Sequence, residues 1–127
     1  MQNFIGVIIE ESLTNKKILS KVKINETKVV PVNEKHQTPH LKQWTLHTIE
    51  ILADNADDIA LELSKTLEGN ENTGYWYADY KNNELVYIVF PIRIFKIAQN
   101  DPEGFQKARD YGISLGIPEY QLSFYPE

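Results

Sequence analysis

The chain contains no cysteine. This absence excludes disulfides, thiolate metal sites, iron–sulfur clusters and a cysteine nucleophile, and it fits a reducing compartment. Long apolar runs are also missing, because the run near the start, Phe4 to Ile9, is too short for a signal peptide or a membrane span. We therefore expect a cytoplasmic protein that does not enter a membrane.

Positive charge is scarce as well. The 13 Lys and Arg residues face 18 Asp and Glu residues, which gives a formal net charge of −5. Nucleic-acid affinity depends on basic side chains that neutralise phosphates, so we expect no nucleic-acid partner. The sequence lacks a P-loop, Gly-x-Gly-x-x-Gly, Gly-x-Ser-x-Gly and His-Glu-x-x-His. The sequence therefore gives no support to the enzyme classes that these motifs mark, and we expect no cofactor.

The size and composition are those of one globular domain. The 127 residues are 42% hydrophobic and 24% charged, enough apolar material to bury a core. We expect a single domain over residues 1–127. Runs rich in β-branched and aromatic residues predict strands. They lie at 4–10, 22–32, 44–52, 74–80 and 85–97, with a last extended segment at 120–125.

Two helices are marked by their end signals. Asn55 is a good N-cap residue before an acidic first turn, and Gly69 supplies a stop after a four-residue apolar repeat. Asp101 followed by proline predicts a second helix that runs toward Gly112 or Gly116. The order of elements predicts an α+β fold, a mainly antiparallel or mixed sheet of about five to six strands with two helices on one face. A ferredoxin-like or related sandwich is the architecture we expect.

The hairpin over residues 74–97 carries an aromatic group. Tyr75, Trp76 and Tyr77 could form a platform for a small ligand, since binding pockets are commonly lined by aromatic side chains. Half-buried hairpins also use aromatic residues simply for cross-strand pairs. Arg93 could clamp a carboxylate or phosphate, or it could mark where the strand leaves the core. These four residues are the candidate ligand-binding residues.

Asp79 is the candidate catalytic acid. If Asn82 and Asn83 form the hairpin turn, Asp79 shares a face with Tyr77 and Ile88, an apolar neighbourhood that raises a carboxyl pKa. Such a group could transfer protons. The alternative is a wet strand end, or a structural ion pair with a neighbouring basic side chain such as Lys81 or Arg93.

All three histidines, His36, His40 and His47, lie within twelve residues. A divalent-metal site is one interpretation, because imidazole is a common ligand of such ions. The other interpretation is that His36 and His40 are solvated loop residues and that His47 is a surface residue of a strand. We expect no metal. His47 is also a second candidate for acid–base catalysis.

Three segments carry a resemblance. They are Gly74–Tyr80, Val89–Pro91 and Tyr111–Pro118, the last with a Leu-Gly-Ile-Pro ending. The chain resembles a group of short, uncharacterised bacterial proteins with an aromatic hairpin followed by a helix and this ending. The resemblance covers roughly the C-terminal half and implies a bacterial, cytoplasmic origin. It brings no activity, ligand or catalytic residue with it.

Two classes of function follow from these features. The first is a non-enzymatic module that binds a small molecule or a protein partner, and it is favoured because catalytic motifs are absent. The second is a small acid–base enzyme, such as a lyase, isomerase or hydrolase, that uses Asp79 with a histidine or tyrosine. A homodimer that packs hairpins or sheet faces together is compatible with either.

Overall fold

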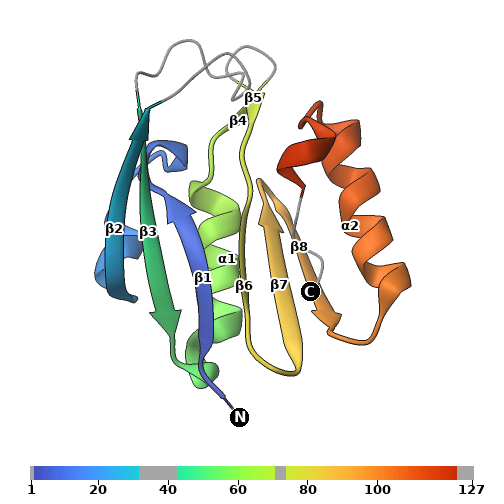
Figure 1. Cartoon of the computed structure of the whole chain (residues 1–127), viewed down its shortest axis with the longest axis horizontal. Coiled ribbons are helices and arrows are strands. Elements are labelled where there is room, and N and C mark those ends of the chain that lie inside the picture. The colour runs from blue at the N-terminus through green and yellow to red at the C-terminus, as the bar shows by residue number, and fades with distance from the viewer. Residues whose placement is uncertain (1, 32–42, 71–73, 123–127) are drawn as a thin grey trace.

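A six-stranded antiparallel sheet lies at the centre of the molecule (Figure 1). The computed structural model describes residues 2–31, 43–70 and 74–122. The strands are β1 (Phe4–Ile9), β2 (Lys23–Pro31), β3 (Gln43–Ile51), β6 (Ala78–Lys81), β7 (Leu85–Phe90) and β8 (Arg93–Ala98). Their order across the sheet is β2-β3-β1-β6-β7-β8, and every neighbouring pair is antiparallel. A separate two-stranded sheet pairs β4 (Gly69–Asn70) with β5 (Gly74–Tyr75).

One face of the sheet is covered by α1 (Ala56–Thr66), as predicted from its apolar repeat. Ile59 and Leu63 of this helix are buried against residues from β1, β3, β6 and β7. The helix ends at Thr66, where Leu67 takes an extended backbone and its amide donates to the Leu63 carbonyl. Gly69, predicted to stop the helix, instead lies in β4, so its role is different from the one expected.

The opposite face is covered over β7 and β8 by α2 (Pro102–Ser114). Its N-cap is confirmed, since the Asp101 carboxylate accepts a hydrogen bond from the Gly104 amide at 3.1 Å. Phe105 and Ala108 are buried in one cluster with Val86, Ile88 and Phe90, the alternate residues of β7. The residues between them, Tyr87 and Val89, belong to the cluster beneath α1.

The α+β class and the antiparallel sheet are confirmed, and two details are different. The helices lie on opposite faces and not on one, because β7 is apolar on both sides and each side needs its own cover. The chain also runs twice through three strands of the six-stranded sheet followed by a helix, β1–β2–β3–α1 and then β6–β7–β8–α2. This order differs from the βαββαβ order of a ferredoxin-like fold. Of the two predicted architectures, the protein therefore has a related α+β sandwich and not a ferredoxin-like fold. None of the described helices is long and apolar enough to cross a membrane.

The long strand predicted over residues 85–97 is in fact two strands, β7 and β8, joined by a tight turn. Phe90 opposes Arg93, so Pro91 and Ile92 are the two turn residues. Ile92 adopts φ 59°, in the left-handed region that β-branched residues avoid, and its side chain is 90% exposed. The last extended segment is also different, because Glu119–Gln121 forms a short 3-10 helix and residues 123–127 lie outside the described part.

Replacing Ile92 with glycine is expected to stabilise the fold by roughly 0.5–1 kcal/mol, because glycine takes the left-handed conformation without steric cost. Urea unfolding at neutral pH measures the change. Ile92→Ala is the control, since it removes the exposed side chain but keeps a Cβ, and it should gain less. A glycine variant that is less stable than the parent protein would contradict this account of the turn.

Candidate ligand pocket

Part of the sheet face opposite α1 has no helix above it in the part of the chain that the structure describes. α2 packs over β7 and β8, whereas β1 and β3 lie further across the sheet (Figure 1). Alternate residues of β1 point to this side, and Ile5 and Val7 are 44% and 42% exposed. The boundary between the covered and the open parts of this face is where the chain forms a pocket.

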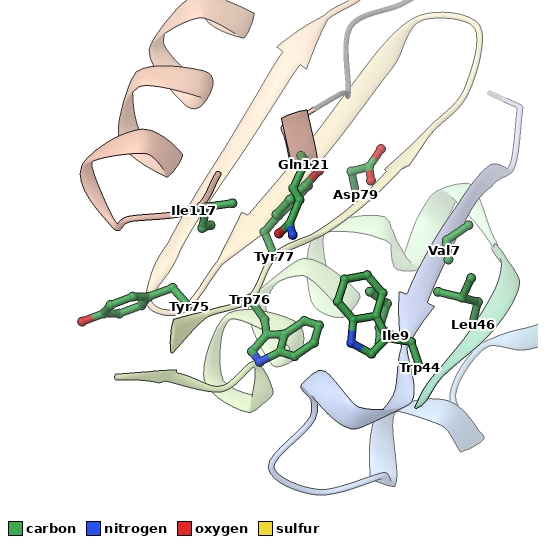
Figure 2. Close-up of a pocket in the computed structure, with 10 residues that line it drawn as sticks. All are labelled: Val7, Ile9, Trp44, Leu46, Tyr75, Trp76, Tyr77, Asp79, Ile117 and Gln121. Carbon is green, nitrogen blue, oxygen red and sulfur yellow. Dashed lines mark hydrogen bonds between the residues drawn. The ribbon is translucent and has the colours of Figure 1, made fainter. Parts of the chain in front are cut away.

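The pocket has a volume of about 230 Å³ (Figure 2). Strands β1 and β3 form its floor, since Ile9 opposes Leu46 and Val7 stands two residues before Ile9 on the same face of β1. The chain from β5 to β6 forms one wall, and the segment after α2 forms another. The residues that line it are Val7, Ile9, Trp44, Leu46, Tyr75, Trp76, Tyr77, Asp79, Ile117 and Gln121.

Aromatic side chains fix the shape of the walls. Trp44 of β3 and Trp76 meet edge to face, with ring centroids 5.4 Å apart and planes at 65°. The Tyr77 hydroxyl donates to the backbone carbonyl of Gln121 and so ties the segment after α2 to the sheet. Figure 2 shows Tyr75 at the outer end of this wall, with its ring directed away from Asp79. The predicted aromatic group therefore lines a pocket and does not form a flat platform.

Asp79 supplies the carboxylate of this pocket. It stands between Val7 of β1 and Ile88 of β7, on the apolar face where the sequence placed it. Burial raises the pKa of the Asp79 carboxyl from 3.8 to about 6, and the charge of Lys81 opposes the shift. Among the described residues, no group donates a hydrogen bond or forms an ion pair with this carboxylate. The structural ion pair considered from the sequence is absent there.

In the β6–β7 hairpin, the two turn residues lie one position later in the sequence than predicted. Lys81 opposes Val86, so Asn83 and Glu84 are the turn residues. The reason is the Asn82 side chain, whose Oδ1 accepts from the amides of Glu84 at 2.9 Å and Leu85 at 2.8 Å. Because the change moves each pair by two residues, the side chains keep their faces.

Arg93 does not join the pocket. It follows the β7–β8 turn, where its guanidinium lies 4.8 Å from the centre of the Phe95 ring and 5.3 Å from that of Tyr111. This stacking on the α2 side of the sheet accounts for its position at the strand end. Of the four predicted ligand-binding residues, Tyr75, Trp76 and Tyr77 line the pocket and Arg93 does not.

His47 lies on the other face of the sheet, among the residues beneath α1, and is only 6% exposed. Its Nδ1 is 2.9 Å from the Thr27 hydroxyl, and its Nε2 is 3.1 Å from a carboxylate oxygen of Glu10. This second contact is the main reason why the pKa of Glu10 is below its usual range. His47 and Asp79 cannot share a proton, because the sheet separates them.

A metal site at the histidines finds no support in the described part of the chain. Both ring nitrogens of His47 already have partners, and His36 and His40 lie outside the described residues. No group of three or more potential ligand side chains occurs among the residues described. His47 instead connects strands β2 and β3 to the segment after β1.

Replacing His47 with alanine is expected to destabilise the fold by about 1–3 kcal/mol, because it removes a buried side chain together with its contacts to Glu10 and Thr27. Urea unfolding measures this loss. The same variant should bind pocket ligands as the parent protein does, since the side chain is on the opposite face. Lost ligand binding in a folded His47→Ala protein would show that the two faces are coupled.

Six of the ten lining residues were missing from the sequence-based prediction. Val7, Ile9, Trp44 and Leu46 come from the N-terminal strands, and Ile117 and Gln121 follow α2. The signal was weak but present, because Ile5, Val7 and Ile9 make β1 apolar on the face that α1 does not cover. Nothing in the sequence, however, places β1 beside β6.

The fold and the pocket define the chain as an α+β domain with a small apolar pocket, in which Asp79 is the one carboxylate among the described lining residues. Comparison of the chain with protein-family models, with curated protein sequences and with solved structures gave no significant match. The resemblance to short bacterial proteins stays a prediction. Function is therefore argued from the pocket.

Proposed function

We propose that this protein is a non-enzymatic module that binds a small organic molecule in the pocket between β1, β3, β6 and the segment after α2. The observation that carries the proposal is a carboxylate, Asp79, that has no partner among the described residues and lies in a pocket with apolar and aromatic walls. Small-molecule sites have this composition, apolar and aromatic walls with a few placed polar groups.

The size of the pocket limits the ligand. About 230 Å³ is below the roughly 300–1,000 Å³ of sites for drug-sized molecules, so the ligand has one or two rings. Flat rings also suit walls made of Trp44, Trp76 and Tyr77. The edge-to-face contact of the two tryptophans holds the wall in place before a ligand arrives.

The energetic cost of Asp79 supports the same conclusion. Burial of a carboxylate without donors destabilises the folded protein. Proteins retain such a group where function requires it, and binding sites commonly show this conflict between stability and activity.

The alternative, an acid–base enzyme, has less support. A general acid or base works with a second group within hydrogen-bond reach of the reacting atoms. His47 is on the other face, and the Tyr77 hydroxyl already donates to the Gln121 carbonyl. Binding without turnover is therefore the function that the arrangement favours.

Intrinsic fluorescence offers a direct test, because both tryptophans of the chain line the pocket. Purified protein is titrated with neutral, cationic and anionic compounds of one or two rings, and melting temperature is measured in parallel. We expect at least one compound to change the emission saturably and to raise the melting temperature. A panel in which no compound does either would overturn the proposal.

A matched pair of variants locates the binding. Val7→Lys places a long cationic side chain in the pocket and should abolish the response. Val29→Lys makes the same change at an exposed strand valine that opposes Thr45 on the other face, so it should leave the response unchanged. Equal effects of the two variants would show that the ligand binds elsewhere.

A further inference from the structure

The charge of the ligand can be inferred from the surroundings of Asp79. Each strand beside it contributes apolar neighbours, Val7 from β1 and Ile88 from β7. The segment after α2 contributes the neutral Gln121 to the same pocket. The carboxylate therefore lies in a pocket whose other described lining groups carry no charge.

Asp79 has two titratable neighbours on its own face of the β6 segment, and neither neutralises the carboxylate. Lys81 is two residues along β6, and its charge lowers the pKa of Asp79 without forming an ion pair within 4.0 Å. Tyr77 is two residues before it, and its hydroxyl donates to the Gln121 carbonyl. The pocket thus contains an anionic acceptor that the described protein leaves without a donor.

We propose that the ligand is a protonated amine on a small ring system, with its ammonium group paired to the Asp79 carboxylate and its ring against the aromatic wall. This inference rests on the proposed function and names the ligand class of that site.

Chemical complementarity favours a cation over the other two charge types. An ammonium group has N–H donors and no acceptor, and its hydrogen bonds to a carboxylate are among the strong ones. The faces of tryptophan and tyrosine also attract cations. A neutral ligand would leave the carboxylate desolvated, and an anionic ligand would be repelled by it.

Three probes of matched size separate the charge types: 2-phenylethylamine, 2-phenylethanol and 3-phenylpropionate. Isothermal titration calorimetry at pH 7.5 should show the amine binding about tenfold or more tightly than the alcohol, with the carboxylate weakest. In Asp79→Asn the affinity for the amine should fall to that for the alcohol, while the alcohol binds as before. Asp58→Asn, an exposed change of equal charge on α1, should keep the amine preference.

The pH dependence gives an independent measurement. The affinity for the amine should fall as the pH is lowered from 7.5 to 5, because Asp79 takes up a proton near pH 6 and loses its charge. The affinity for the alcohol should change little over this range. Melting curves at each pH show that the protein remains folded.

The outcomes distinguish the inference from the function on which it rests. Equal affinity for all three probes, or an amine preference that survives in folded Asp79→Asn, would overturn the amine inference and leave a ligand pocket supported. No binding of any probe, together with no response to the wider panel, would overturn the proposed function as well.

Discussion

Replacing Gly6 with alanine is expected to destabilise the fold by about 3 kcal/mol or more, because the added methyl group has no room. A Cβ at this position would lie 2.2 Å from the carbonyl oxygen of Asp79 and 2.7 Å from the Cα of Tyr80. Gly6 pairs directly with Tyr80, so β1 and β6 approach each other closely there. The obstructing atoms are backbone atoms of a strand that β7 holds from the other side, and they cannot move aside cheaply.

Urea unfolding of the purified variant measures the loss, and soluble expression gives a first indication. Gly74→Ala is the control, because Gly74 has φ +85° but a Cβ added there would meet no described atom within 4 Å apart from its chain neighbours. That variant should lose only about 1 kcal/mol, the cost of a left-handed alanine. Similar losses in the two variants would contradict the close approach of β1 and β6.

Replacing Asp79 with asparagine is expected to stabilise the protein at pH 7.5 by about 1–3 kcal/mol. The pKa of this carboxyl rises from 3.8 to about 6 on folding, so between these values the folded protein binds more protons than the unfolded chain. The stability of the parent protein should therefore increase as the pH falls from above 6 toward 4. The upper limit follows from about two pKa units at roughly 1.4 kcal/mol each, and partial exposure of the side chain lowers it.

Urea unfolding at several pH values between 4 and 7.5 tests this expectation. The variant should lack the gain on acidification, and the two proteins should approach equal stability near pH 4. Asp58→Asn, which leaves Asp79 in place, should keep the gain on acidification. A less stable Asp79→Asn protein at pH 7.5 would mean that the carboxylate has a stabilising partner. Greater stability combined with a lost amine preference would identify Asp79 as a residue kept for binding.

Local signals predicted most elements of this fold because their causes lie within a few residues. The cap at Asp101 and the proline after it specify the start of α2 whatever packs against the helix. The first three strands lie within one residue of their predicted ends, since β-branched runs favour extended backbone.

The turn at Pro91 and Ile92 shows what local signals miss. Pro91 suits the first turn position, but an isoleucine at φ 59° is unfavourable by itself, so local preference does not favour Ile92 at the second position. The Ile92 amide donates to the Ser64 carbonyl of α1 at 2.8 Å, and this contact comes from a helix far away in the sequence. Tertiary packing therefore turns one predicted central strand into a hairpin with an edge strand.

The candidate site divides in the same way. The sequence by itself determined that Tyr75, Trp76 and Tyr77 lie close to an acid, and the period of two along a strand placed Asp79 on an apolar face. Only the tertiary structure decided that β1 lies beside β6, that α2 covers part of that face, and that His47 lies behind the sheet. Side-chain alternation is a property of one strand, whereas a pocket requires strands and helices that are distant in sequence to meet.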